Sequence, residues 1–315
     1  MNIILTLLCI SFSALATDSQ NINKLDNWIK IDINDHQSAG LMLENAEADT
    51  AILIVAGSGP TDHNGNVTTN GMINNSYKML ATELHQAGYA VLRFDKQGIG
   101  KSAHKNFNMS KVLFIDYVND VVAWVNHLKS NYTKVVIIGH SLGGLMAIQA
   151  AQKADVNRLI TLASVADTGY RTIKRQMGYQ PEFISAAAIP LLDRLAQGKH
   201  IPAEEVPTYL NALLHPSIQP YLLSFMLIEP RAELSQLNIP TLNIIGDTDL
   251  QVKTEETENM SADLDHVSLK IIHGMNHVLK KAPLERNTNL ATYSNPDLPL
   301  HEELIPSILQ FLDNK

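Results

Sequence analysis

Short apolar runs alternate with longer amphipathic stretches through most of the chain. The runs are four to six residues long and continuous, which is typical of strands buried on both faces of a sheet. Between them, apolar residues recur at helical spacing. Strand–helix alternation at this spacing indicates crossover units, so the pattern predicts an α/β fold, a mostly parallel sheet covered by helices on both faces. The predicted strands are residues 51–56, 89–94, 135–138 and 159–162, and the predicted helices are 77–87 and 114–128.

The pattern changes at the start and in the middle of the chain. Residues 28–43 alternate on either side of a polar turn, which predicts an antiparallel hairpin at a sheet edge. From about 168 to 228 the strand pattern lapses and prolines separate short apolar helical pieces, which predicts a helical cap inserted into the sheet domain. The sheet pattern resumes at 240–245 and 268–272, and residues 300–312 predict a closing amphipathic helix.

The N-terminal residues resemble a targeting signal. Residues 3–15 are nearly all apolar, and Ala14, Leu15 and Ala16 match an A-x-A cleavage site. The run is too short to span a bilayer, so we expect a signal peptide over 1–16, cleaved after Ala16, and a secreted or periplasmic protein of residues 17–315. Because no Lys or Arg precedes the run, a buried first strand or helix remains the alternative.

Composition excludes several classes of partner. The 315 residues are 45% hydrophobic and carry a net charge of −8, without a basic stripe that could bind a nucleic acid backbone. No basic amphipathic segment suggests a stable membrane anchor. The single cysteine, Cys9, would leave with the signal peptide, and no H-E-x-x-H motif occurs, so neither a structural zinc nor another cofactor is expected.

One motif carries chemistry. Within residues 134–149 a β-branched run breaks into G-H-S-L-G and continues as a helix-favouring segment. This is the strand–turn–helix context of a G-x-S-x-G nucleophile elbow, in which glycines allow a turn so tight that the serine hydroxyl stands clear of the backbone. The motif predicts Ser141 as a nucleophile, with an ordinary strand-to-helix turn as the bland alternative.

A serine nucleophile needs a base, an acid that orients the base, and donors for the oxyanion. In the fold that carries such an elbow, the acid and the histidine follow the serine in that order, each after a strand. The loop after the strand at 240–245 offers Asp247 and Asp249, and the loop after 268–272 offers His273 and His277.

These loops resemble the α/β-hydrolase superfamily, from about residue 51 to the C-terminus. The family acid commonly lies in G-x-x-D-x-x-V, and the chain reads G-D-T-D-L-Q-V from Gly246. The resemblance therefore implies that Asp249 is the acid and that Asp247 braces the turn. In a less common family variant the acid follows the preceding strand, which leaves Asp167 as a minor candidate.

The same resemblance assigns the base and the oxyanion donors. The family histidine ends a G-x-N-H loop, which implies His277 as the base, with His273 structural and His140 unable to reach round to act. One oxyanion N–H belongs to the residue after the nucleophile, Leu142. The other comes from the loop after the first parallel strand, where relatives read H-G-x-G and this chain reads A-G-S-G, which implies the Ser58 amide.

Two further loops are expected to support the site. Residues 60–66 are unusually polar, and Asp62 and Asn64 are expected to tie down the oxyanion loop through Asx-type bonds, with substrate contact as the alternative. Residues 93–102 resemble the family's F-D-x-x-G-x-G-x-S segment, for which we expect a bracing role.

The resemblance implies a serine hydrolase that cleaves a carboxylic ester of a small molecule through an acyl-enzyme, without a cofactor. Together with the predicted signal peptide, it predicts a secreted or periplasmic enzyme. Its capped plan is similar to serine aminopeptidases and monoglyceride lipase-like esterases. A peptidase would need an acidic group for the substrate amine. The acidic residues available in the cap are Glu182, Glu204, Glu205 and Glu229. A non-catalytic binding protein on the same fold is the alternative from another class.

Overall fold

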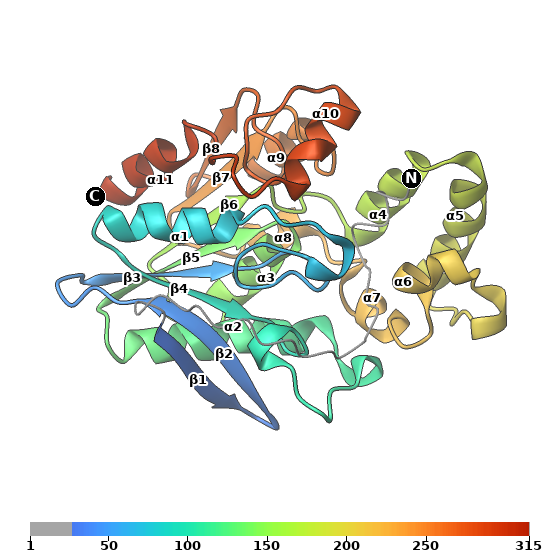
Figure 1. Ribbon diagram of the computed structural model, residues 1–315, viewed down its shortest axis with the longest axis horizontal. Helices are drawn as coiled ribbons and strands as arrows, with labels where there is room; N and C mark the ends of the chain where they lie inside the picture. Colours follow the sequence, from blue (N-terminus) through green and yellow to red (C-terminus); the bar gives the residue numbers. More distant parts are fainter. Residues whose placement is uncertain (1–26, 315) are drawn as a thin grey trace.

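The computed structural model describes residues 27–314, which form one eight-stranded sheet in the order β1-β2-β4-β3-β5-β6-β7-β8 (Figure 1). β1 (Asn27–Ile33) and β2 (His36–Leu43) make an antiparallel hairpin at one edge, and β2 pairs antiparallel with β4. All other neighbours are parallel, so the predicted mostly parallel sheet is confirmed. The parallel strands are β3 (Thr50–Val55), β4 (Ala90–Asp95), β5 (Lys134–His140), β6 (Arg158–Leu162), β7 (Thr241–Gly246) and β8 (Val267–Ile272).

Helices cover both faces of the sheet because alternate residues of its central strands point to opposite sides. In β3, Ile52 and Ile54 pack in a cluster with α1 (Ser76–Gln86) and α11 (Leu304–Asp313), while Leu53 and Val55 join the opposite cluster. That second cluster takes in α2 (Phe114–Lys129) and α3 (Leu142–Ala151). Continuous apolar strands are therefore buried on both sides, as expected for a parallel sheet.

The chain between β6 and β7 is helical, the stretch in which the sequence pattern predicts a cap. Its main helices lie together beside the sheet (Figure 1). The Phe114 ring of α2 lies 5.4 Å from the Phe225 ring and 6.5 Å from the Tyr221 ring, which joins this segment to the sheet domain. The helices are α4 (Gly169–Gly178), α5 (Glu182–Ala196), α6 (Asn211–Leu214), α7 (Gln219–Phe225) and α8 (Pro230–Leu234).

Three C-terminal helices differ from the sequence expectation. α9 (Thr254–Ser261) and α10 (Arg286–Ala291) are mostly polar, so they present no apolar periodicity to find. α11 begins at Leu304 rather than near residue 300, and the backbone N–H of His301, just before it, donates to the Leu279 carbonyl at 2.8 Å.

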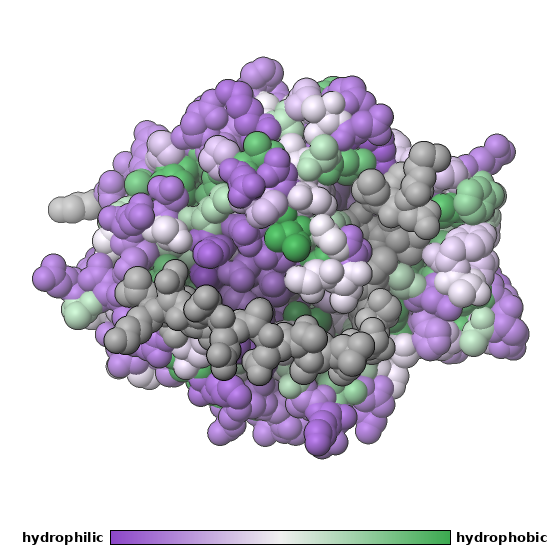
Figure 2. All heavy atoms as spheres, viewed as in Figure 1, coloured by the Kyte–Doolittle hydropathy of each residue, from purple (hydrophilic) through white to green (hydrophobic). Residues whose placement is uncertain are grey.

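The surface is mainly polar. Hydrophilic side chains cover most of the face drawn in Figure 2, and apolar residues form small, separated patches there. None of the helices within residues 27–314 has the length and apolarity needed to cross a membrane. The signal peptide predicted over residues 1–16 lies outside the described residues.

Candidate active site

The elbow is a strained turn between β5 and α3. Ser141 has φ 54° and ψ −127°, a conformation that a non-glycine residue adopts only where the surroundings enforce it. Its N–H donates to the Leu162 carbonyl at 3.0 Å, and its carbonyl accepts from Gly144 N–H at 2.9 Å. A Cβ on Gly143 would lie 2.5 Å from the Val55 carbonyl oxygen, so only glycine fits there. The turn therefore places the Ser141 hydroxyl at the carboxyl end of β5.

Three side chains form a continuous hydrogen-bonded chain at this edge of the sheet. His277 Nε2 lies 3.2 Å from Ser141 Oγ, and His277 Nδ1 lies 2.8 Å from Asp249 Oδ2. The other Asp249 oxygen accepts from the N–H groups of Gln251 and Val252 at 2.6 and 3.0 Å. The Asp249 side chain is also fully buried. These donors therefore hold its carboxylate in place. The geometry holds Nδ1 protonated and leaves Nε2 free to accept the serine proton.

The alternative acids and base are occupied elsewhere. Asp247 accepts from His273 Nδ1 at 2.5 Å and from Gly274 N–H at 2.7 Å, so it joins the two loops, and the His273 side chain is 93% exposed. Burial opposes ionisation of Asp247, but these hydrogen bonds outweigh it and lower the pKa of its carboxyl. Asp167 accepts from Arg171 at 2.9 Å.

His140 is a buried bridge. Its Nε2 lies 2.7 Å from the His277 carbonyl oxygen and its Nδ1 lies 2.7 Å from the Tyr77 hydroxyl. Burial, together with the nearby His277, lowers the pKa of His140 to about 3, so the ring is neutral. Nε2–H must then donate to His277, and Nδ1 accepts from Tyr77, whose oxygen accepts from Gly57 N–H at 3.2 Å. His140 is therefore a link between the base and the loop after β3.

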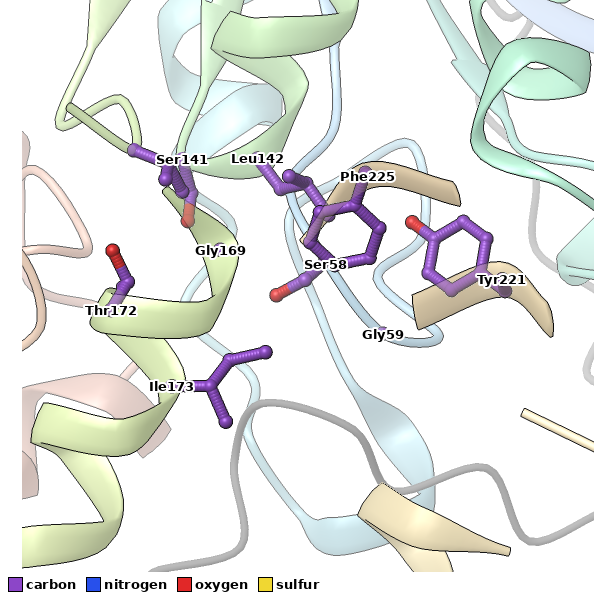
Figure 3. Close-up of a pocket in the computed structure, with 10 residues that line it drawn as sticks. Ser58, Gly59, Ser141, Leu142, Gly169, Thr172, Ile173, Tyr221 and Phe225 are labelled. Atoms are coloured by element: carbon purple, nitrogen blue, oxygen red, sulfur yellow. The ribbon is translucent and has the colours of Figure 1, made fainter. Parts of the chain in front are cut away.

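The loop after β3 lies directly against the nucleophile. A Cβ on Gly57 would lie 2.9 Å from the Ser141 Cβ, and Ser58 lines the same cavity as Ser141 and Leu142 (Figure 3). Leu142 is the first residue of α3, where an N–H has no intrahelical acceptor. Both residues for which sequence comparison predicts an oxyanion amide thus lie beside Ser141.

The two supporting loops are held by carboxylates. Asp62 Oδ1 accepts from Asn64 N–H at 2.8 Å and from Asn66 N–H at 2.9 Å, an Asx arrangement of the kind expected. Asp95 accepts from His63 N–H at 2.8 Å with one oxygen and from Lys101 N–H at 2.9 Å with the other. The latter bond bends the chain back after β4.

Two supporting side chains were missed by the sequence reasoning, Tyr77 and Lys96. Lys96 is buried and its Nζ donates to the carbonyl oxygens of Gly57 and Gly59. Neither residue carries a signal in the sequence beyond its place in a predicted element. Their partners lie 20 to 63 positions away along the chain, so only the folded structure brings them together.

The cavity at Ser141 is small and apolar. It has a volume of about 30 Å³, and Figure 3 shows residues of α4 and α7 opposite the nucleophile. Thr172 supplies a buried hydroxyl that has no hydrogen-bond partner among the described residues. The residues that α4 and α7 contribute to the cavity lining are Gly169, Thr172, Ile173, Tyr221 and Phe225.

No acidic side chain lines this cavity within the described part of the chain. Two of the four candidate glutamates are paired on the exposed surface, Glu205 with Arg194 and Glu229 with Arg171. Glu182 and Glu204 are exposed as well. Across residues 27–314, no group of three or more His, Cys, Asp or Glu side chains is arranged to hold a metal ion.

Known proteins show matching sequence and structure. The family model for serine aminopeptidases of the S33 type matches residues 67–213. Esterase EstD of Thermotoga maritima is 24% identical over 250 residues, which cover 75% of this chain but only 57% of that esterase.

Solved structures agree on the fold. The esterase Pf2001 of Pyrococcus furiosus superimposes with a TM-score of 0.59 at 16% identity, covering 94% of this chain and 95% of the other. Est1E of Butyrivibrio proteoclasticus, solved with ferulic acid bound, gives a TM-score of 0.58 at 20% identity, covering 91% and 100%. The eight-stranded sheet and these structures show the α/β-hydrolase fold, and over residues 67–213 the chain is similar to S33 serine aminopeptidases.

Proposed function

We propose that this chain hydrolyses carboxylic esters of small molecules, with Ser141 as the nucleophile. The observation that carries the proposal is the buried hydrogen-bonded chain from Ser141 through His277 to Asp249, which opens onto an apolar cavity. This combination of nucleophile, base and orienting acid is what acyl transfer requires.

The proposed reaction uses these residues in turn. Ser141 Oγ attacks the acyl carbon as His277 Nε2 takes its proton, and the carbonyl oxygen becomes an oxyanion facing the Ser58 and Leu142 amides. Collapse of the tetrahedral intermediate breaks the ester bond, and His277 returns the proton to the leaving alkoxide. Water, deprotonated by the same histidine, then attacks the acyl-enzyme and releases the acid. Asp249 keeps the ring in one tautomer and stabilises its cationic form.

An ester fits the cavity better than a peptide with a free amino terminus. An ammonium group placed near Ser141 would meet apolar side chains, and burying an uncompensated charge is costly. The four cap glutamates lie on the exposed surface, away from the residues that line the cavity. EstD is named as an esterase, which supports the same choice for this chain.

The acyl group is proposed to be short. A volume of about 30 Å³ is two to three times the 10–15 Å³ that one water molecule needs, which favours an acetyl or propionyl group beside Ser141.

Turnover of matched substrates tests this function. We expect p-nitrophenyl acetate to be hydrolysed with a higher kcat/KM than the butyrate, the decanoate or alanine p-nitroanilide. Higher kcat/KM for the anilide would favour the aminopeptidase alternative. No turnover of any of the four would favour the non-catalytic binding protein.

We further propose that the chain is exported to the periplasm or the medium. The support is the apolar run and the A-x-A site at residues 14–16. Expression of the full chain followed by intact-mass measurement is expected to give a protein that begins at Thr17. A protein that retains residues 1–16 and stays in the cytoplasm would contradict export.

A further inference from the structure

Lys96 is an unusual lysine, because its ammonium group is buried and no carboxylate within residues 27–314 pairs with it. It follows β4, its residue exposure is 4%, and its Nζ donates to the Gly57 and Gly59 carbonyls, the latter at 2.9 Å. The Tyr117 ring lies 5.9 Å from the same nitrogen. Asp95, its chain neighbour, directs both carboxylate oxygens to His63 and Lys101 instead. Buried lysines without a paired charge are costly, so a function is expected to retain one.

The two carbonyls flank Ser58, the residue proposed to supply an oxyanion amide. The Gly57 carbonyl and the Ser58 N–H belong to one peptide group, and in a trans peptide these two dipoles point in opposite directions. A cation that holds the carbonyl from one side therefore fixes the direction of the N–H on the other. It also polarises the amide, since hydrogen bonds strengthen one another along a chain in surroundings of low dielectric constant.

The Gly57 residue is held on its other side as well. Its N–H donates to the Tyr77 hydroxyl at 3.2 Å, and Tyr77 is tied through His140 to the backbone of His277. Lys96 thus acts on the peptide plane between Gly57 and Ser58. A flip of this plane about ψ of Gly57 and φ of Ser58 would turn the Ser58 amide away from the oxyanion.

We propose that Lys96 is a positioning residue that locks the Gly57–Ser58 peptide with its N–H directed at the oxyanion, and so stabilises the transition state without touching the substrate. The inference rests on the proposed ester hydrolysis at Ser141. Its signature is a loss confined to steps that form an oxyanion, because Lys96 lies behind the loop and not in the cavity.

The test compares Lys96→Met with Lys101→Met in the full chain. Methionine fills a similar volume without the charge, and Lys101 is an exposed lysine of the same loop whose Nζ lies over the Trp28 ring. Removing one oxyanion donor outright costs about 10²–10³ in kcat, so misdirecting one is expected to lower kcat about 10- to 100-fold. KM for p-nitrophenyl acetate should stay within about threefold, and Lys101→Met should match the wild type.

A tetrahedral analogue separates positioning from general damage. Phenyl trifluoromethyl ketone accepts Ser141 Oγ at its carbonyl carbon, the π electron pair moves to the oxygen, and the serine proton goes to His277, which gives a bound hemiketal oxyanion. Its inhibition constant should rise in Lys96→Met by the same factor as kcat/KM falls. A single cooperative thermal unfolding transition of the variant, measured without the analogue, serves as the folding check.

Each outcome decides. Loss of kcat with an unchanged inhibition constant would overturn the inference, as would wild-type kcat in Lys96→Met. If Lys96→Met fails to fold, Lys96→Gln, which keeps a donor without the charge, is expected to retain more activity than Lys96→Leu, and equal activities would overturn the inference. Failure of wild type to hydrolyse any ester would instead sink the proposed function itself.

Discussion

The carboxyl ends of the strands and the helical segment of residues 169–225 differ in the polarity of the side chains that they bring to Ser141. At the strand ends the polar groups are paired: Asp249 accepts from two amides and from His277, and His140 is bonded through both ring nitrogens. In the helices of residues 169–225, the side chains that face Ser141 are mainly apolar, and Thr172 retains a buried hydroxyl with no partner among the described residues.

This difference assigns the acyl-transfer reaction to the strand ends and the choice of ester to the helices. Paired polar groups hold each other within tenths of an ångström, which acyl transfer needs. Apolar walls set only the size and polarity of what enters, so they change with less effect on the chemistry. Substitutions at the strand ends are therefore expected to lower every turnover alike, whereas substitutions in the helices are expected to change which ester is preferred.

The largest effect is expected at the base. His277→Ala removes the only group within hydrogen-bond reach of Ser141 Oγ that is placed to take its proton, among the described residues. The loss of kcat for p-nitrophenyl acetate should approach the roughly 10⁶-fold seen when one member of a comparable triad is removed. His273→Ala, on the same loop but exposed, should keep most of the activity; the reverse pattern would mean that the base is misassigned.

A smaller but still large effect is expected at the acid. Asp249→Asn keeps the shape but offers His277 an amide, which favours the wrong tautomer and should lower kcat about 10⁴-fold. Asp247→Asn is the matched control, because Asp247 joins the two loops without reaching His277. Steady-state kinetics of both variants provide the comparison, and an equal loss in the two would contradict the assignment.

A substitution in the helices that line the cavity is expected to change the acyl-chain preference without abolishing turnover. Ile173→Ala enlarges the cavity beside Ser141, so the ratio of kcat/KM for the butyrate to that for the acetate should rise about tenfold or more. The two acyl groups differ by two methylenes, and one methylene alone gives at least about tenfold discrimination in an apolar pocket. Parallel assays of the two esters measure this ratio. An unchanged ratio would mean that the acyl group binds elsewhere.

The smallest effect concerns pH. Burial lowers the pKa of Lys96 to about 7, and the groups that face it are the Gly57 and Gly59 carbonyls and the Tyr117 ring, whose own pKa is raised by burial. As pH rises through about 7 the ammonium is lost, so kcat/KM should decline about twofold or more on the alkaline side, and Lys96→Met should lack this decline.

The free energy of unfolding should rise with pH, whereas kcat/KM should fall. The unfolded chain keeps Lys96 protonated up to its ordinary pKa of 10.5, so between pH 7 and 10.5 the unfolded state binds more protons. The contribution of Lys96 to the free energy of unfolding therefore rises with pH in this window and is lost as pH falls through about 7. Urea unfolding of wild type and Lys96→Met at pH 7 and 9 measures this contribution. The same change in the free energy of unfolding between the two pH values in both proteins would contradict a buried lysine that loses its proton near pH 7.

Much of this could be predicted from the sequence because it depends on local backbone requirements. The elbow needs glycine where Gly143 meets the carbonyls of β3, and parallel strands bring the loops of Asp249 and His277 to one edge. Those constraints are visible as short motifs at the ends of apolar runs.

The rest depends on contacts between distant positions. The bonds from Lys96 to the loop after β3, and from Tyr77 to His140, join residues that no periodicity relates. The cavity lining depends on how α4 and α7 pack over Ser141, and apolar spacing gives the helices without their placement. Polar helices such as α9 leave no apolar signal at all.

The central claim is that Ser141 is an activated nucleophile, and covalent labelling tests it most directly. Treatment with a fluorophosphonate, followed by intact-mass measurement and peptide mapping, is expected to add one phosphonyl group to the wild type at Ser141. Ser141→Ala should gain none, and His277→Ala should react far more slowly. Equal labelling of wild type and Ser141→Ala, or no labelling of the wild type, would contradict the account.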